Sequence, residues 1–176
     1  ARNIVEHMIS LGHKRIAFIS GDKGHRSTEE RKQGYREALI DSGLSVDPAL
    51  EIDGSYSFES GVKGLKTLLE QDDVPTAIFA CNDEIASGTL FAARLNGIDV
   101  PGKLAIAGFE NSPFSRQTWP KLTTAAQPTD EIARDAARTL IDMVESGRNA
   151  RFASQEVQHV HFHPELVVRE STYLPD

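Results

Sequence analysis

The stretch VPTAIFACNDEIASG, residues 74–88, contains a strand pattern followed directly by the start of a helical pattern. The nearly unbroken apolar run Thr76–Cys81 has the length of a strand, and because it does not alternate, it is typical of a strand buried on both faces. Asn82 and Asp83 follow at once, with no turn glycine or proline between. These two side chains either cap the next helix or contact a ligand beyond the end of the strand.

The rest of the chain alternates helical and strand patterns in the same way. Apolar runs of strand length occupy Arg15–Ser20 and Leu104–Phe109, and a weaker strand lies within 50–56. Helices are expected at 1–11, 28–42, 57–70, 83–96 and 128–146. Their expected N-caps and closing glycines are Thr28, Ser57, Gly12, Gly43, Gly97 and Gly147. Continuously apolar strands separated by helices predict an α/β fold, a parallel sheet with helices on both faces.

Composition limits the classes of protein that fit. The 176 residues are 39% hydrophobic and 26% charged, as in ordinary globular proteins. No apolar run is long enough to span a membrane, and the first residues lack the layout of a signal peptide. One cysteine, Cys81, suits a reducing cytosol, so a cytoplasmic location is expected. The net charge of −7 disfavours binding of this chain to a phosphate backbone.

Polar side chains follow three of the predicted strands where each strand ends. In an open parallel sheet, ligands bind beyond these carboxyl ends, so the side chains are expected to share one site. Carboxylates, amides and an arginine suit neutral, hydroxyl-rich ligands. Motifs of common enzyme classes, such as a nucleophile elbow or a phosphate loop, are missing, so no enzymatic activity and no cofactor are predicted. The residues at this edge are Asp22, Asn82, Asp83, Glu110 and Asn111, with Arg31 nearby.

The segment HVHFHP offers a metal-binding alternative. His159, His161 and His163 would share one face of a strand, where three imidazoles could bind zinc. A solvent-facing edge strand, with Val160 and Phe162 turned inward, explains the pattern without a metal. The prediction is therefore that no metal is bound.

Six segments carry a resemblance to a known family. They are LGHKRIAFISG, ERKQGYREAL, GSYSFESG, PTAIFACNDEIASGTLFAARLNGIDVPGKLAIAGFEN, WPKLTTAAQP and HPELVVREST. In this order they resemble the C-terminal part of the effector-binding domain of LacI/GalR-type transcriptional regulators. That domain has the fold of periplasmic sugar-binding proteins, here a type I lobe. The resemblance covers essentially the whole chain.

The resemblance implies roles for individual residues. Arg31 would contact effector hydroxyls, Tyr56 would stack on the sugar face, and Asn82 would be a further polar contact. The family normally has Asp after the Gly-Phe pair, whereas this chain has Glu110. The additional methylene either moves this carboxylate towards a smaller ligand or takes it out of the site. Gln127, in a segment that crosses between lobes, would be another contact.

The resemblance also implies an organisation. Residues 1–124 would be the C-terminal lobe, 125–150 a crossing segment and helix of the N-terminal lobe, and 151–176 a return strand and tail. The expected function is effector sensing and homodimerisation, with a small carbohydrate as ligand. Operator DNA would be bound only by a headpiece absent from this chain, and no membrane is involved. The alternatives are a periplasmic-type sugar-binding protein for transport and a His-rich metal-dependent enzyme.

Overall fold

The computed structural model describes residues 1–149 and 160–173, and side chains are described outside 146–149. The chain divides into two compact units, each described separately below. The first comprises residues 1–126 and 166–176, and the second comprises residues 127–165. The assignment of 125–150 to a second lobe of the family fold stays a prediction.

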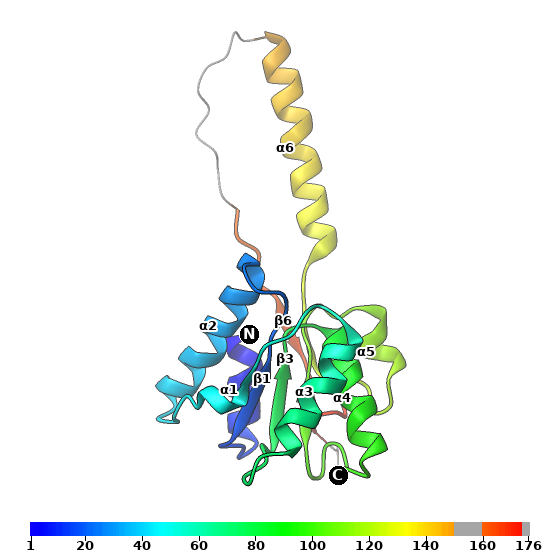
Figure 1. Cartoon of the computed structure of the whole chain (residues 1–176). Helices are drawn as coiled ribbons and strands as arrows, with labels where there is room; N and C mark the ends of the chain where they lie inside the picture. Colours follow the sequence, from blue (N-terminus) through cyan, green and yellow to red (C-terminus); the bar gives the residue numbers. More distant parts are fainter. Residues whose placement is uncertain (150–159, 174–176) are drawn as a thin grey trace. The chain divides into compact units, whose positions relative to one another are not determined.

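The first unit alternates helices and strands, as the sequence predicts (Figure 1). Its helices are α1 (Arg2–Ser10), α2 (Arg26–Asp41), the 3-10 turn η1 (Pro48–Leu50), α3 (Phe58–Leu69), α4 (Asp83–Leu95) and the short α5 (Pro113–Gln117). Its strands are β1 (Ile16–Ile19), β2 (Glu51–Ile52), β3 (Ala77–Ala80), β4 (Ala105–Ala107), β5 (Thr124–Ala126) and β6 (Glu165–Val167). Glu165, the first residue of β6, is assigned to the second unit.

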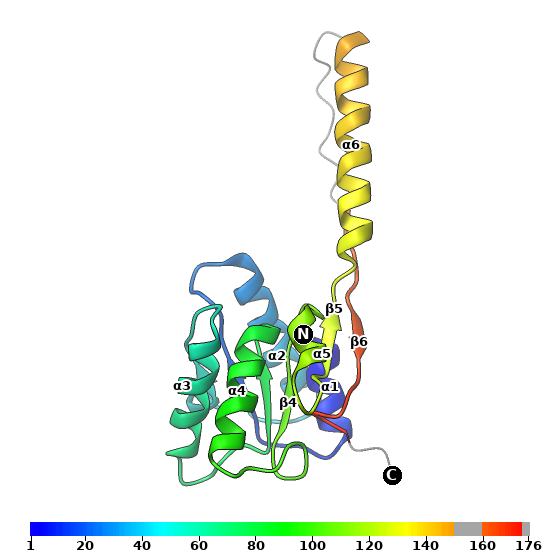
Figure 2. The same ribbon diagram turned by 90° about the vertical axis from the view of Figure 1, so that its right-hand side faces the viewer.

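Four strands form a parallel sheet in the order β2-β1-β3-β4. Every residue of β1, β3 and β4 is buried, because helices cover both faces. Helices α1 and α2 pack together on one face, and α3 and α4 on the other (Figure 2). The predicted α/β fold is confirmed.

Two helices on the second face approach each other unusually closely. A Cβ atom on Gly61 of α3 would lie 2.0 Å from the carbonyl oxygen of Ile85, and one on Gly88 of α4 would lie 1.9 Å from that of Phe58. Only glycine allows two backbones to touch in this way. The contact sets the distance between the N-terminal ends of α3 and α4, which both lie at the carboxyl edge of the sheet.

The predicted helix ends are mostly confirmed. Ser57 caps α3 by accepting a hydrogen bond from the amide of Ser60, and Gly12, Gly43 and Gly97 all have positive φ after their helices. The prediction that Thr28 is an N-cap is wrong. Helix α2 begins at Arg26, so Thr28 lies inside its first turn, where its hydroxyl contacts Tyr56 instead. Phe114 lies in the short helix α5, which the sequence analysis did not predict.

The chain rejoins the first unit after residue 165. Strands β5 and β6 form a two-stranded sheet, and Ser171 is fully buried beyond it. The Ser171 carbonyl accepts a hydrogen bond from the Ile106 amide at 2.9 Å, and its hydroxyl accepts one from the Thr123 amide at 2.8 Å. The C-terminal segment therefore covers the outer edge of β4.

The second unit contains helix α6 (Thr129–Asn149). The predicted closure at Gly147 is wrong, since the helix continues through Asn149. Its apolar residues include Leu140, Ile141 and Val144, which are all exposed in this chain. Within the described ranges, none of the helices has the length and apolar character that a bilayer span requires.

Candidate functional site

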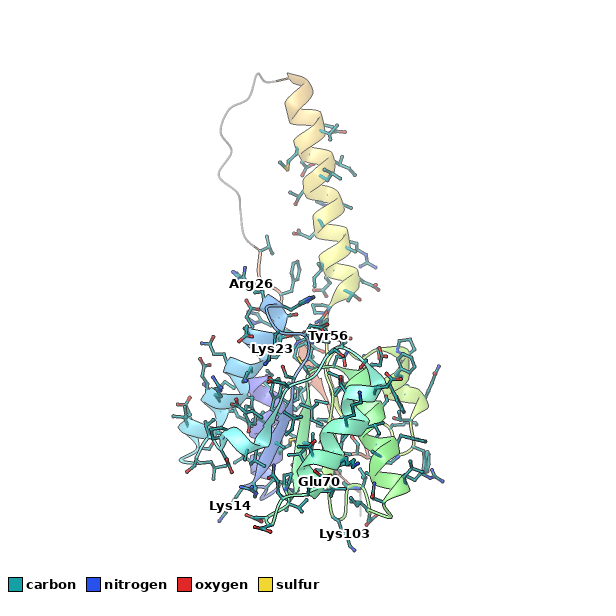
Figure 3. All side chains as sticks on the ribbon, in the orientation of Figure 1. Lys14, Lys23, Arg26, Tyr56, Glu70 and Lys103 are labelled. Atoms are coloured by element: carbon teal, nitrogen blue, oxygen red, sulfur yellow. The ribbon has the colours of Figure 1, made fainter. Side chains whose placement is uncertain are left out.

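The candidate site lies at the carboxyl ends of β1 and β3, the two central strands. The chain leaves β1 for α2 on one face and leaves β3 for α4 on the other, so the connections diverge at this point. In open parallel sheets, ligands bind at such a switch point. Figure 3 shows Tyr56 at this end of the first unit with Lys23 and Arg26, whereas Lys14, Glu70 and Lys103 lie at the opposite end.

Arg31 is the central side chain of this site. It lies in α2 and is only 8% exposed, yet the one hydrogen bond it makes to the described residues runs from Nη1 to the carbonyl of Cys81, at 2.7 Å. Its guanidinium carbon lies 4.1 Å from the ring centroid of Phe109, a cation–π contact. Because a guanidinium has five N–H donors, most of its donors are left for a ligand.

Glu110 supplies a carboxylate next to this arginine. Its Oε1 lies 3.5 Å from Nη1 of Arg31, and its side chain is 37% exposed. Partial burial raises the pKa of the Glu110 carboxyl, against the opposing effect of the Arg31 charge. Glu110 has a φ of 114°, and Asn111 follows with a φ of 55°. Strained backbone of this kind concentrates at ligand sites. The side chain of Glu110, one methylene longer than the Asp usual at this position in the resembled family, lies within ion-pair distance of Arg31.

Asn82 is both a helix cap and a polar group at the edge. Its Oδ1 accepts a hydrogen bond from the Ile85 amide at 2.9 Å, so the capping interpretation is confirmed. Its Nδ2 makes no hydrogen bond to the described residues, although the residue is largely buried. The cap therefore fixes the side chain and leaves the NH2 group as a donor. The capping and ligand-binding interpretations are compatible.

Tyr56 is held against the end of β1. Its hydroxyl hydrogen-bonds with Thr28 at 2.7 Å and with Ser27 at 3.0 Å. Its ring lies directly over Gly21, where a Cβ atom would come within 2.4 Å of the ring. One ring face is thus in contact with the backbone, and His25 flanks the ring at 5.9 Å between centroids.

Two weaker candidates have internal partners. Asp83 is fully buried, and its carboxylate accepts hydrogen bonds from the Thr124 hydroxyl at 2.6 Å and the Ser112 amide at 2.7 Å. Burial raises its pKa, although these hydrogen bonds oppose the shift. Asn111 accepts a hydrogen bond from Arg169 at 2.7 Å. These contacts tie the end of β4 to α4 and β5, which explains both residues without a ligand.

The remaining predicted residues are only partly placed. Asp22 is half-buried at the edge, and its side chain makes no hydrogen bond to the described residues. Gln127 belongs to the second unit, so its ligand contact stays a prediction. Over the part of the chain that the structure describes, no three His, Cys, Asp or Glu residues are placed to hold a metal. His159, one of the three predicted alternatives, lies outside the described residues.

Sequence reasoning missed residues that support the site. Phe109 directly precedes Glu110, and an aromatic ring at a strand end was a visible signal for a partner of a buried arginine. Arg169 gave no such signal. It donates from Nη1 to the carbonyl of Leu122 and from Nη2 to Asn111, across more than 40 residues of sequence. Only the tertiary structure reveals that it holds the loop carrying Glu110.

The comparisons with known proteins agree with this geometry. The model of the periplasmic binding protein-like domain matches residues 5–172. The chain belongs to this family. The HTH-type transcriptional regulator DegA of Bacillus subtilis (strain 168) is 40% identical over 167 residues, which cover 95% of this chain and 48% of DegA. The chain thus spans about half the length of the curated relatives it matches.

Solved structures of this periplasmic-binding-protein-like family include similar regulators. A complex of the transcriptional regulator CelR with cellobiose has a TM-score of 0.86 at 33% identity, covering 95% of this chain and 49% of that one. A LacI-family regulatory protein from Chloroflexus aggregans also gives 0.86 at 33% identity, covering 97% and 59%. The predicted resemblance to LacI-type regulators is confirmed. The relatives named here are regulators rather than enzymes, as predicted.

Proposed function

We propose that the chain is the effector-sensing part of a LacI-type transcriptional regulator and binds a small carbohydrate at the carboxyl edge of its sheet. The observation that carries the proposal is Arg31, a buried guanidinium oriented by the Cys81 carbonyl and the Phe109 ring, with most of its donors unused. Holding a buried guanidinium in a fixed orientation while most of its N–H donors stay unused suits a residue that completes its hydrogen bonds with a ligand.

The groups around Arg31 suit a sugar or a similar polyol. A hydroxyl both donates and accepts, so neighbouring hydroxyls can accept from Arg31 and Asn82 while donating to Glu110. Tyr56 adds an apolar ring near the same edge. The similarity to a regulator solved with cellobiose supports this ligand class. Gln127 is proposed as a further contact from the second unit.

We further propose that the protein acts as a homodimer in the cytoplasm. The large apolar side chains Phe91 and Leu95 on α4, Phe114 on α5 and Trp119 just beyond α5 are all exposed, and an apolar surface of this kind is typical of an interface. Operator DNA would be bound by a headpiece outside this chain, because the chain itself has a net charge of −7. A saturable, sequence-specific complex of the chain with DNA in a low-salt gel shift would contradict this division of roles.

The ligand site is tested in the longer parent protein. A thermal-shift screen against mono- and disaccharides identifies the effector, since a ligand that binds the native state raises the melting temperature. Arg31→Ala should then abolish both the shift and the response of operator binding to that sugar. Operator binding without the sugar should persist, which shows that the variant is folded.

A matched control lies on the same helix. Arg26 is exposed and pairs only with Glu30 among the described residues, so Arg26→Ala should retain the full response to the sugar. If Arg31→Ala responds to the effector as the unaltered protein does, the site assignment is wrong. If both arginine variants lose the response, a general loss of surface charge rather than this site is responsible.

A further inference from the structure

Glu110 lies on backbone that needs support from its surroundings. Its φ of 114° and the φ of 55° at Asn111 both lie in the region that most non-glycine residues avoid. Such residues persist only where the surrounding structure fixes them. The side chain of Glu110 gives little support, because its one partner among the described residues is Arg31, at 3.5 Å. The placement of this carboxylate therefore depends on contacts that neighbouring residues make.

Arg169 supplies such contacts from the segment that follows β6. Its Nη2 donates to Oδ1 of Asn111 at 2.7 Å, and its Nη1 donates to the carbonyl of Leu122 at 2.7 Å and to the hydroxyl of Ser115 at 3.1 Å. Its backbone is also fixed, since its amide donates to the hydroxyl of Thr123 at 2.8 Å. One guanidinium thus joins the two ends of the loop that follows β4.

The bond to Asn111 bears directly on Glu110, because the two residues share a peptide. The amide of Asn111 donates to the hydroxyl of Thr124 in β5 at 3.2 Å, so Asn111 is held through its backbone as well as its side chain. This double attachment keeps the shared peptide in its strained orientation. Without the bond from Arg169, the pair can relax towards negative φ, and the Glu110 carboxylate then moves away from Arg31.

We propose that Arg169 is a positioning residue of the candidate site, which acts on a bound sugar only through Asn111 and Glu110. The proposal rests on the proposed function, because it requires Glu110 to accept hydrogen bonds from the sugar. Arg169 does not bind the sugar itself, since both of its Nη atoms are occupied within the loop. Lysine cannot replace it, because a single ammonium lacks the planar fork of donors that reaches both ends of the loop.

The test measures sugar affinity in the longer parent protein. Of glucose, galactose, fructose, ribose, maltose and cellobiose, the sugar that raises the melting temperature most is titrated by calorimetry. Arg169→Lys should weaken its binding about tenfold, the lower end of what a hydrogen bond to a charged group is worth. Arg26→Lys is the same change at an exposed position near the site, and it should bind as the unaltered protein does. If none of these sugars binds, the proposed function is contradicted and this inference falls with it.

A double variant separates positioning from general stabilisation. In a Glu110→Ala background, Arg169→Lys should change the affinity less than about twofold, because the group through which it acts is gone. A tenfold loss in that background as well would show a purely structural role and overturn the proposal. If Glu110→Ala alone leaves the affinity unchanged, the role of Glu110 and this proposal are both refuted, while the assignment of Arg31 stands.

Two variants at Asn111 test the same link if replacing the arginine prevents folding. Asn111→Asp keeps the acceptor for Arg169 and tolerates the positive φ, so it should retain the affinity. Asn111→Gly also tolerates the positive φ but lacks the acceptor, so it should weaken binding about tenfold. Equal sugar affinities of these two variants would refute the link from Arg169 to Glu110.

Discussion

Replacing Gly88 by alanine tests how the two helices at the candidate site are spaced. The new Cβ atom would lie 1.9 Å from the carbonyl oxygen of Phe58, whereas ordinary contact begins at 3.4 Å. The clashing atom belongs to the backbone, so no side chain can rotate away, and α3 and α4 would have to separate by more than about 1 Å, with loss of packing between them.

The size of the effect follows from two opposing contributions. Alanine in place of glycine favours a helix by about 1 kcal/mol, and overpacking in a tight contact costs about 1–3 kcal/mol and occasionally more. Because the obstruction is backbone, we expect the upper end of that cost and a net loss of about 2 kcal/mol in the free energy of unfolding. Gly61→Ala should behave alike, since its Cβ would lie 2.0 Å from the Ile85 oxygen.

The two changes should not be additive. One separation of the helices relieves both clashes, so the double variant should lose less than the sum of the single variants, by roughly 0.5 kcal/mol or more. Urea denaturation followed by circular dichroism measures all three free energies. Thr67→Ala, at an exposed position in α3, is the control and should stay within about 0.5 kcal/mol of the unaltered chain. A Gly88→Ala variant as stable as the unaltered chain would refute the close-contact argument.

Three further predictions concern the edge of the sheet and α6. Because the pKa of Glu110 is raised in the folded chain, its ionisation costs stability, so the stability that it contributes is complete at low pH and is lost as pH rises through the raised pKa. Glu110→Gln should therefore match the unaltered chain in melting temperature near pH 4 and exceed it near pH 7, and equal melting temperatures at both pH values would contradict this. Gly21→Ala should displace Tyr56 and weaken sugar binding by the parent protein while changing its melting temperature little, since only the far end of a flexible side chain obstructs the new methyl group. Unchanged affinity in a sugar titration would disprove the role of Tyr56. Leu140 and Ile141 should be covered by protein outside this chain, because leaving several aliphatic side chains in water forgoes roughly 1.5–3 kcal/mol each. Changing both to Gln should lower the melting temperature of the parent protein while reducing light scattering by the isolated chain, and an unchanged melting temperature of the parent would count against it.

The fold could be predicted because its determinants are local. Each buried strand is an unbroken apolar run, and three helices, α1, α2 and α4, are followed by a glycine with positive φ, at Gly12, Gly43 and Gly97. Thr28 shows where local rules end. Its sequence suits an N-cap, but its hydroxyl bonds to Tyr56 across 28 residues, and the helix begins two residues earlier.

The candidate site could be predicted only in outline. The polar residues at the strand ends are visible in the sequence because strand ends in a parallel sheet share an edge. What each residue does there depends on contacts distant in sequence, such as the bonds that occupy Asp83 and the packing of Arg31 on Phe109. Asn82 shows that a cap and a ligand contact need not exclude each other, since one atom of the amide serves each purpose.

The burial of Ser171 has a kinetic consequence. The ribosome synthesises β4 well before Ser171, and at about 5–20 residues per second the interval lasts roughly 3–13 seconds. Until Ser171 arrives, the Ile106 amide lacks its partner, and the outer edge of β4 is incompletely paired. An open strand edge is a site where nascent chains associate wrongly. The outer edge of β4 is thus completed last, when the C-terminal segment of the first unit arrives. Slow translation between residues 127 and 165 would therefore prolong the stage at which this unit is most prone to aggregate.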